Sequence, residues 1–257
     1  MDLGLEGKVA VVTGASKGIG AAISRELAEQ GCSLALCARG IDELDALASE
    51  IRDSTAAEVF ATSADVTDPE QVERFRDEVL AEHETVDVLI NNAGRSYPGN
   101  FETLTDDDFL DDYTVKGLSH IRMSRAFLSS LRKSDAARIV NINSIHGKHA
   151  DARFFTSSVN RAASIAFART LALWLAPEKI CVNSVNIGYV LTPQWANVHQ
   201  RISPELEATD FFAEMGAREV PMGRMGRPEE VAGIVTFLAS ARASYITGAS
   251  IDVGGGQ

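Results

Sequence analysis

Three glycines near the start of the chain have a spacing that suits phosphate binding. Gly14, Gly18 and Gly20 belong to the stretch TGASKGIG, which follows a short apolar run and opens a helical stretch. The first glycine permits a tight turn, the second a close approach of the backbone to a pyrophosphate, and the third close helix–strand packing. A helix N-terminus adds unpaired N–H donors for the phosphates. We therefore expect a dinucleotide to contact Gly14, Ser16, Lys17, Gly18, Ile19 and Gly20.

The end of the second apolar run bears on which dinucleotide is bound. An acidic residue there would hold the ribose 2′-hydroxyl of NAD(H) and repel a 2′-phosphate. This chain has Cys37, Ala38 and Arg39, without an acid. The planar guanidinium of Arg39 can pair with a phosphate, and Lys17 can add a second positive charge. These residues predict NADP(H) rather than NAD(H), unless both cations are simply solvated at the surface.

Apolar runs alternate with helical stretches along the whole chain. The runs are continuous rather than alternating, which is typical of a parallel sheet covered by helices on both faces. The sequence therefore predicts one α/β domain over residues 1–257, a Rossmann-like doubly wound sheet of about seven strands. We place the strands at 8–12, 33–38, 59–63, 86–91, 138–143, 180–185 and 249–253.

Helical spacing and capping residues mark the connections. Asp68, followed by Pro69 and Gln71, has the pattern of a helix N-cap and capping box. We place the other helices at 20–30, 41–52, 106–131, 155–175 and 228–238.

The segment 192–220 is too long for an ordinary connection, so we expect either a mobile lid or a small helical insert. Its apolar side chains would line a substrate pocket or anchor the segment on the domain; they are Trp195, Phe211, Phe212 and Met215.

The bulk composition limits the partners and the compartment. The formal net charge of −12 argues against a nucleic acid or an anionic membrane as a partner, because both need a positive face on the protein.

Cys32, Cys37 and Cys181 form no CxxC pair, and free buried thiols in a reducing cytoplasm are expected. Residues 1–7 carry two acids and no long apolar run, so we expect neither a signal peptide nor a membrane anchor. No metal is expected.

Several motifs in a fixed order resemble the short-chain dehydrogenase/reductase (SDR) family over essentially the whole chain. They are TGASKGIG, an Asp-Val pair after the third strand, NNAG at 91–94, VNSV at 182–185, and RPEEVA and YITG near the C-terminus. Ile187 replaces a proline that the family usually has. The resemblance implies an NAD(P)(H)-dependent oxidoreductase with further cofactor contacts at Asp65, Val66, Asn92, Ala93, Gly94, Gly188 and Thr192.

This chain differs from the family at three of its four catalytic positions. Members of the family use a Ser, a Tyr, a Lys four residues later and an Asn. Ser144 matches the family serine, whereas Ser157 stands at the tyrosine position and Arg161 at the lysine position. Thr114 replaces the asparagine. A helical spacing of four puts Ser157 and Arg161 on one face, where both can still point at the cofactor.

These replacements change the chemistry of proton transfer. The pKa of a tyrosine phenol is about 10, and a nearby cation can lower it toward neutral pH, whereas a serine hydroxyl is far less acidic. Arg161 stays protonated, so it can hold ribose hydroxyls but cannot relay a proton. His146, two residues after Ser144, is a candidate acid or base, with pocket lining as the alternative. His149 and Tyr97 are weaker candidates for the same role.

Three functions remain open from the sequence. The first is an NADP(H)-dependent oxidoreductase that interconverts a carbonyl and an alcohol, or reduces an activated double bond, with non-standard proton handling. The second is an inactive nucleotide-binding or scaffold protein on the same fold. The third is a lyase or isomerase with His146 as base. The resemblance implies a small-molecule substrate and a homo-oligomer, a dimer or tetramer, formed through the helices at 106–131 and 155–175. The free cysteines indicate a cytoplasmic location.

Overall fold

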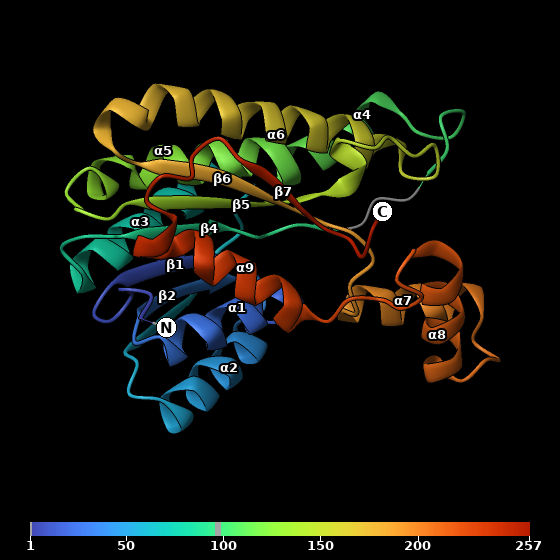
Figure 1. The fold of residues 1–257 in the computed structure, drawn as a ribbon, viewed down its shortest axis with the longest axis horizontal. Helices are drawn as coiled ribbons and strands as arrows, with labels where there is room; N and C mark the ends of the chain where they lie inside the picture. The colour runs from blue at the N-terminus through green and yellow to red at the C-terminus, as the bar shows by residue number, and fades with distance from the viewer. Residues whose placement is uncertain (1, 96–98) are drawn as a thin grey trace.

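The computed structural model describes residues 2–95 and 99–257, and these form a parallel sheet between two layers of helices (Figure 1). The strands follow the order β3-β2-β1-β4-β5-β6-β7, and every neighbouring pair is parallel. The predicted doubly wound sheet is therefore confirmed. The strands are β1 (Val9–Thr13), β2 (Ser33–Ala38), β3 (Val59–Ser63), β4 (Val88–Asn91), β5 (Arg138–Ser144), β6 (Cys181–Ile187) and β7 (Ser250–Val253).

Each face of the sheet buries its own apolar cluster. Ala10 and Val12 of β1 pack with α1, α2 and α9 on one face, whereas Val11 packs with α3, α5 and α6 on the other. Successive residues of a strand point to opposite faces, so a continuous apolar run is what two covered faces require. The helices are α1 (Gly18–Glu29), α2 (Ile41–Ser54), α3 (Pro69–Glu82), α5 (Ser119–Leu131), α6 (Phe155–Leu175) and α9 (Pro228–Ala239).

One helical prediction needs correction, and for the segment 192–220 the structure shows one of the two forms that were expected, a small helical insert. The helix expected over 106–131 is divided into α4 (Asp106–Tyr113), a π-helical turn (Thr114–Leu118) and α5. Gly117 lies so close to the Tyr113 ring that a Cβ on it would be 2.4 Å from a ring carbon, and this contact accompanies the wider turn. The segment 192–220 is a helical insert of α7 (Pro193–Ile202) and α8 (Ala208–Glu219). Phe211 and Met215 of α8 anchor it on Tyr189.

The capping pattern at α3 is confirmed in part. The Asp68 carboxylate accepts hydrogen bonds from the backbone N–H groups of Glu70 and Gln71. The Gln71 side chain does not return to the backbone of Asp68, as a capping box would require. Its amide group donates to the Asp68 carboxylate, and its oxygen accepts the backbone N–H of Asp65 at 3.0 Å. The start of α3 therefore fixes the loop that follows β3.

The strand order places a crevice beside β1. Chain connections run from β1 outward to β2 and β3 on one side, and continue through β4 to β7 on the other. The carboxyl ends of the strands at such a switch point leave a crevice in which ligands bind in open α/β sheets. Short 3₁₀ turns at Ile145–Gly147, Ala176–Glu178 and Ala241–Ala243 complete the described connections.

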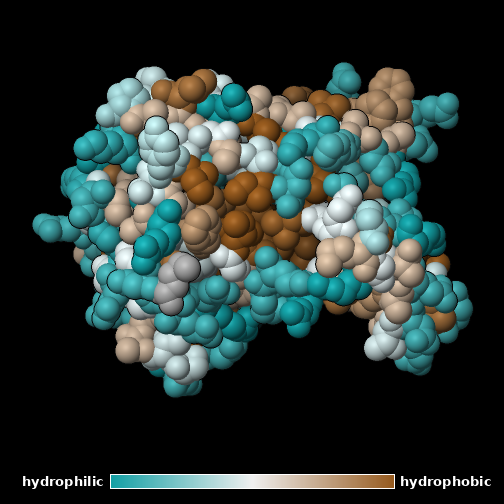
Figure 2. Space-filling model, viewed as in Figure 1, coloured by the Kyte–Doolittle hydropathy of each residue, from teal (hydrophilic) through white to brown (hydrophobic). Residues whose placement is uncertain are grey.

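Apolar side chains gather at the centre of one face of the molecule, where Figure 1 places β7 and α9 (Figure 2). Strand β7 is an edge of the sheet, since β6 is its one neighbour among the described strands. Among the described residues, no helix is both long and apolar enough to cross a bilayer. The three cysteines are free and buried, as predicted, and burial raises the pKa of the Cys32 and Cys37 thiols to about 12.

Candidate active site

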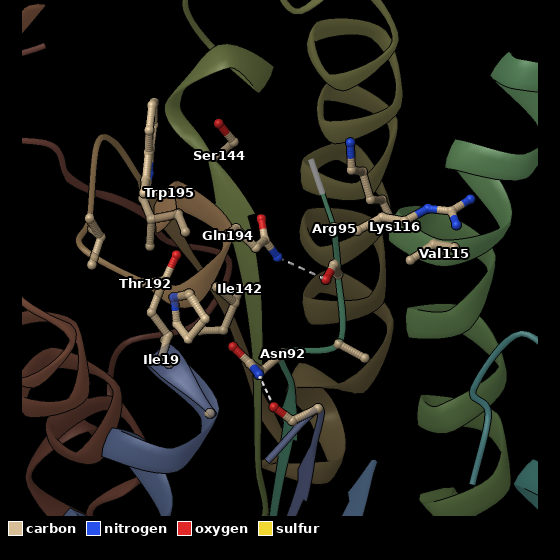
Figure 3. A pocket seen from close by; sticks show the side chains of 18 of the residues that line it. Ile19, Asn92, Arg95, Val115, Lys116, Ile142, Ser144, Thr192, Gln194 and Trp195 are labelled. Carbon is tan, nitrogen blue, oxygen red and sulfur yellow. Dashed lines mark hydrogen bonds between the residues drawn. The ribbon is translucent and has the colours of Figure 1, made fainter. Parts of the chain in front are cut away.

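A cavity of about 690 Å³ lies at the carboxyl ends of the strands. It extends from Arg39 after β2, past the glycine turn, to the inner sides of α7 and α8. Figure 3 shows its middle part, with Asn92 low in the cavity, Ser144 at the end of β5 and Lys116 on the opposite wall. Every residue predicted to contact the cofactor lines this one cavity.

The glycine turn has the geometry of a phosphate cradle. Gly14 and Gly18 have φ angles of +62° and +58°, which L side chains rarely adopt. A Cβ on Gly20 would lie 2.2 Å from the Gly14 carbonyl oxygen, so only glycine allows this contact between helix and strand. Lys17, the N-cap of α1, makes no side-chain capping bond. The first N–H groups of the helix are therefore free of a side-chain cap and lie along the cavity, where phosphates would fit.

Asn92 fastens the glycine turn to the central strands. Its side-chain amide, drawn low in the cavity in Figure 3, donates to the carbonyl of Thr13 and to that of Gly14, each at 3.0 Å. The Thr13 hydroxyl in turn accepts the backbone N–H groups of Asn92 and Ala93. A Cβ on Gly14 would come within 2.8 Å of the Ala93 backbone. These contacts hold the cradle rigidly at the crevice.

Arg39 and Lys17, the two cations expected to bind a 2′-phosphate, differ in their ion pairing at the far end of the cavity. Arg39 is exposed and lines the cavity, and within the described part of the chain its guanidinium has no ion pair. Lys17 is already paired, with its Nζ 3.0 Å from a Glu43 oxygen. Arg39 is therefore the better-placed phosphate ligand. Nearby, Asp65 accepts the Thr67 hydroxyl at 2.7 Å, and Val66 lines the same end.

Ser144 and His146 reach the cavity from the turn after β5. The Ser144 hydroxyl accepts the backbone N–H of His146 at 3.3 Å. The His146 ring stacks on Phe154, with centroids 4.5 Å apart, and burial lowers its pKa. A neutral imidazole can accept a proton but carries no cationic proton to give. His149 is exposed and lies outside the main cavity, and Tyr97 lies outside the described residues.

A buried lysine contacts Ser157. Lys116 projects from the π-helical turn, its Nζ donates to Ser157 Oγ at 2.6 Å, and the same Nζ lies 2.6 Å from Asp112 Oδ1. The Lys116 and Asp112 side chains are only 2% and 0% exposed. The Asn160 amide donates to the other Asp112 oxygen at 2.9 Å. Burial, reinforced by the positive charge of Arg161, lowers the pKa of Lys116 to about 8, although Asp112 acts in the opposite direction.

Arg161 lies one helical turn beyond Ser157 and also faces the cavity. Its Nη1 donates to the Ile142 carbonyl at 2.9 Å. A Cβ on Gly94 would lie 2.9 Å from Nη2, so the guanidinium passes directly beneath the NNAG loop. Burial lowers the pKa of Arg161 to about 10, which leaves it charged at neutral pH. Arg161 is therefore a fixed cation at the floor of the cavity.

One predicted catalytic residue does not reach the cavity. The Thr114 hydroxyl donates to the Leu110 carbonyl at 2.8 Å, and Thr114 is absent from the cavity wall. The π-helical turn presents Val115 and Lys116 instead. Sequence reasoning missed Lys116 and its partner Asp112. A signal was available, because an acid and a lysine four residues apart share a helix face.

Aromatic and apolar side chains line the cavity beyond Ser144. Tyr189 and Trp195 pack with ring centroids 4.9 Å apart, and Phe154 and Met215 lie beside them on the wall. Arginines also line this region, at positions 95, 153, 201 and 218. Three of them are already held by acidic neighbours: Arg95 by Asp111, Arg153 by Asp151 and Glu219, and Arg218 by Glu219.

The strand order, the glycine cradle and the cavity at the switch point define a Rossmann-like nucleotide-binding protein. Residues 14–257 match a family model described as enoyl-(acyl carrier protein) reductase. The chain is 31% identical over 257 residues to the 3-oxoacyl-[acyl-carrier-protein] reductase FabG of Aquifex aeolicus, covering 100% of both chains. The chain belongs to the short-chain dehydrogenase/reductase family.

Two solved structures are also similar over nearly their full length. The L-sorbose reductase of Gluconobacter frateurii, complexed with NADPH and L-sorbose, has a TM-score of 0.96 and 29% identity, covering 100% of this chain and 98% of that one. An NADPH-bound short-chain oxidoreductase of Pseudomonas aeruginosa PAO1, described as containing an atypical catalytic center, has a TM-score of 0.91 and 34% identity, with 97% and 96% covered. The NADP(H) expected from Arg39 agrees with the cofactor of both proteins.

Proposed function

We propose that the protein is an NADP(H)-dependent oxidoreductase that interconverts a carbonyl and an alcohol, with proton handling that does not use a tyrosine. The observation that carries the proposal is a single cavity joining the glycine cradle to Ser144, Ser157 and Lys116. Reduction of an activated double bond would use the same positions. The substrate is a small, partly apolar molecule, because Tyr189 and Trp195 line its end of the cavity.

The residues along the cavity fit NADP(H). The glycine cradle and the start of α1 suit the pyrophosphate, and Arg39 suits the 2′-phosphate. Asp65 and Val66 would border the adenine, and Gly188 and Thr192 the nicotinamide. When bound, NADPH supplies a hydride. The protein contributes binding, orientation and electrostatics around it.

Ser144 and Arg161 would orient the reacting groups. The Ser144 hydroxyl can donate a hydrogen bond to the substrate oxygen, on which negative charge develops. Arg161 can hold the ribose hydroxyls and adds positive charge beneath the site. Fixed donors and cations of this kind stabilise a developing oxyanion without reorganising during the reaction. Helices α7 and α8 would cover the substrate and limit its contact with water.

No described tyrosine takes the place of the missing phenol. Among the described tyrosines only Tyr189 lines the cavity, and burial raises its pKa. A phenol with a raised pKa gives up its proton less readily at neutral pH. Tyr189 is therefore better suited to packing against Trp195 than to proton transfer.

We also propose that the protein forms a homo-oligomer, a dimer or a homotetramer. The outer side of α6 exposes apolar residues, of which Leu173 is 73% and Val159 50% exposed. The apolar area over β7 and α9 is a second candidate contact (Figure 2). Light scattering on the purified protein should give at least twice the 27.6 kDa chain mass, with Leu173→Glu reducing it. A monomeric wild-type protein would refute this proposal.

The proposed activity is tested by following NADPH absorbance with a panel of ketones, aldehydes and activated alkenes, after NADPH binding has been measured by fluorescence. We expect binding, and oxidation of one NADPH per product formed. Binding without turnover of any member would favour an inactive nucleotide-binding protein. Substrate conversion without a change in NADPH would instead favour a lyase or isomerase with His146 as base.

A further inference from the structure

Lys116 is the least expected charged group of the cavity wall. Its side chain is 2% exposed, although an ammonium ion removed from water costs free energy unless it is paired. The contacts of the Lys116 ammonium group do more than neutralise its charge inside the fold. Asp112, which accepts a hydrogen bond from Asn160, pairs with one side of the ammonium group, but the group also donates a hydrogen bond to Ser157, which lines the cavity. A purely structural ion pair would not need this contact with the reaction space.

Ser157 lies where its hydroxyl can contact both Lys116 and a bound substrate. Ser157 belongs to the first turns of α6 and lies one helical turn before Arg161. Lys116 reaches it from the π-helical turn on the neighbouring helix, and Figure 3 shows its side chain extending away from that helix. The hydroxyl therefore stands between a buried ammonium group and the space in which a substrate oxygen would lie.

We propose that Lys116 is the proton source of the reaction and that the Ser157 hydroxyl passes its proton to the substrate oxygen. The inference rests on the oxidoreductase function proposed above and names the groups that replace a tyrosine. Ser157 is then the residue that touches the substrate, and Lys116 acts through it.

The proposed reduction needs one hydride, which NADPH would supply, and one proton, which Lys116 supplies through Ser157. In reduction, the carbonyl carbon receives a hydride, and the π-electron pair of the C=O bond moves to the oxygen. That oxygen takes the proton of the Ser157 hydroxyl, and Ser157 Oγ takes one from the Lys116 ammonium group. The neutral Lys116 amine recovers a proton from water along the same route after the alcohol leaves. Oxidation runs through these steps in reverse.

The charges that face Lys116 fit a group that changes protonation near neutral pH. Asp112 from α4 favours the ammonium form, whereas Arg161 from α6 and Arg95 after β4 disfavour it. His146 also lies within electrostatic reach. Together with burial, these groups bring the pKa of Lys116 to about 8. General acids and bases work best when their pKa lies near the operating pH.

The first test compares Lys116→Met and Lys116→Arg with the wild-type protein. Reduction by wild-type protein should decline as pH rises through about 8, and oxidation should increase over the same interval. Both variants should lose about 100-fold or more in kcat/KM while still binding NADPH, because arginine keeps the charge but gives up no proton. Lys133→Met, an exposed lysine after α5, is the matched control and should leave activity unchanged. Full activity in Lys116→Arg would overturn the proposal.

The second test needs no turnover. In ¹⁵N-lysine-labelled protein, the Nζ resonance absent from Lys116→Met should titrate near pH 8 rather than near the ordinary value of 10.5. Ser157→Ala should keep this titration but lose activity, and Ser157→Thr should restore most of it. Titration above pH 10, or an active Ser157→Ala variant, would contradict the relay. A wild-type protein that turns over no substrate would instead refute the proposed function.

Discussion

Two buried cations share one carboxylate beside the reaction space. Lys116 and Arg161 both line the cavity, and Asp112 is the acidic group that favours the charged form of each. One carboxylate cannot neutralise two cations, so this wall stays positive while Lys116 is protonated. A positive wall favours the negative charge that grows on a carbonyl oxygen during reduction. The same arrangement makes the protonation of Lys116 sensitive to its neighbours.

Asp112 should set the pH at which the proposed proton source changes state. Its carboxylate raises the pKa of Lys116 against the effect of burial. Asp112→Asn should therefore lower the pKa of Lys116 below about 8 and move the alkaline loss of reductase activity to lower pH. The measurement is kcat/KM for reduction from pH 6 to 10. Asp107→Asn, an exposed acid in the first turn of α4, is the control. If the pH dependence of kcat/KM were the same in Asp112→Asn as in wild type, the alkaline loss of activity would not come from Lys116.

Arg39 should decide between the two nicotinamide cofactors. Its exposed guanidinium lies at the cavity end without an ion pair in the described part of the chain, whereas Lys17 is held by Glu43. A charge-assisted hydrogen bond contributes about 1.5–3 kcal/mol, so Arg39→Asp should weaken NADPH binding by about 10–100-fold and NADH binding much less. Fluorescence titration with both nucleotides measures this difference. Lys17→Met should have the smaller effect, and equal losses for both nucleotides would argue against a 2′-phosphate contact at Arg39.

At the scale of elements, the sequence predicts strands better than the details of helices. All seven strands were found within two residues of their expected bounds, because a buried parallel strand is a short, continuous apolar run. The π-helical turn could not be anticipated, because the contact of the Tyr113 ring with Gly117 that accompanies it is a detail of packing that no sequence pattern indicates. Each residue turns an α-helix by about 100°, so one extra residue in a turn redirects the side chains that follow. The family resemblance places Thr114 at the site, whereas the π-helical turn presents Val115 and Lys116 to the cavity.

Gly117 should be necessary for this turn. A Cβ there would lie 2.4 Å from the Tyr113 ring, so Gly117→Ala must displace either the ring or the backbone. Overpacking of this kind costs about 1–3 kcal/mol, which urea unfolding can measure. Gly233→Ala in α9 is the matched control, because a Cβ there meets nothing closer than 3.9 Å and alanine favours a helix. Tyr113→Ala should relieve most of the cost in the double variant. If both glycine variants behave alike, the ring contact does not hold the turn.

At the scale of the whole molecule, the site depends on elements far apart in the sequence. The cavity takes its wall from the glycine turn, the loops after β2 to β6, the π-helical turn and the insert after β6. The glycine pattern and the parallel sheet predict where these segments meet, since the carboxyl ends of the strands share one edge. They do not predict which side chains touch across it. The Lys116–Ser157 contact joins residues 41 positions apart, and only the packing of α6 against the π-helical turn creates it.

The helices packed beneath the site should also make the whole fold sensitive to acid. His120 of α5 is buried beside Ser164 of α6, with Nδ1 3.0 Å from the Ser164 hydroxyl, and its Nε2 has no hydrogen-bond partner among the described residues. Burial, together with the charge of Arg161, lowers the pKa of His120 from 6.5 to about 3. Between these two pH values the unfolded chain binds a proton that the folded protein does not. The free energy of unfolding should therefore fall as pH decreases below about 6.5, by about 1.4 kcal/mol per pH unit from this residue.

Urea unfolding of wild-type protein and His120→Gln at pH 7.5 and 5.0 measures this contribution. The variant should be less stable at pH 7.5, because it disturbs a buried contact, but it should lose about 2 kcal/mol less than wild type on acidification. His149→Gln removes an exposed histidine and should keep the wild-type dependence. The decisive quantity is the difference between the two pH values, because it cancels the cost of the substitution itself. Equal losses in wild type and His120→Gln would mean that His120 is protonated in the folded protein, and that the interface between α5 and α6 admits water.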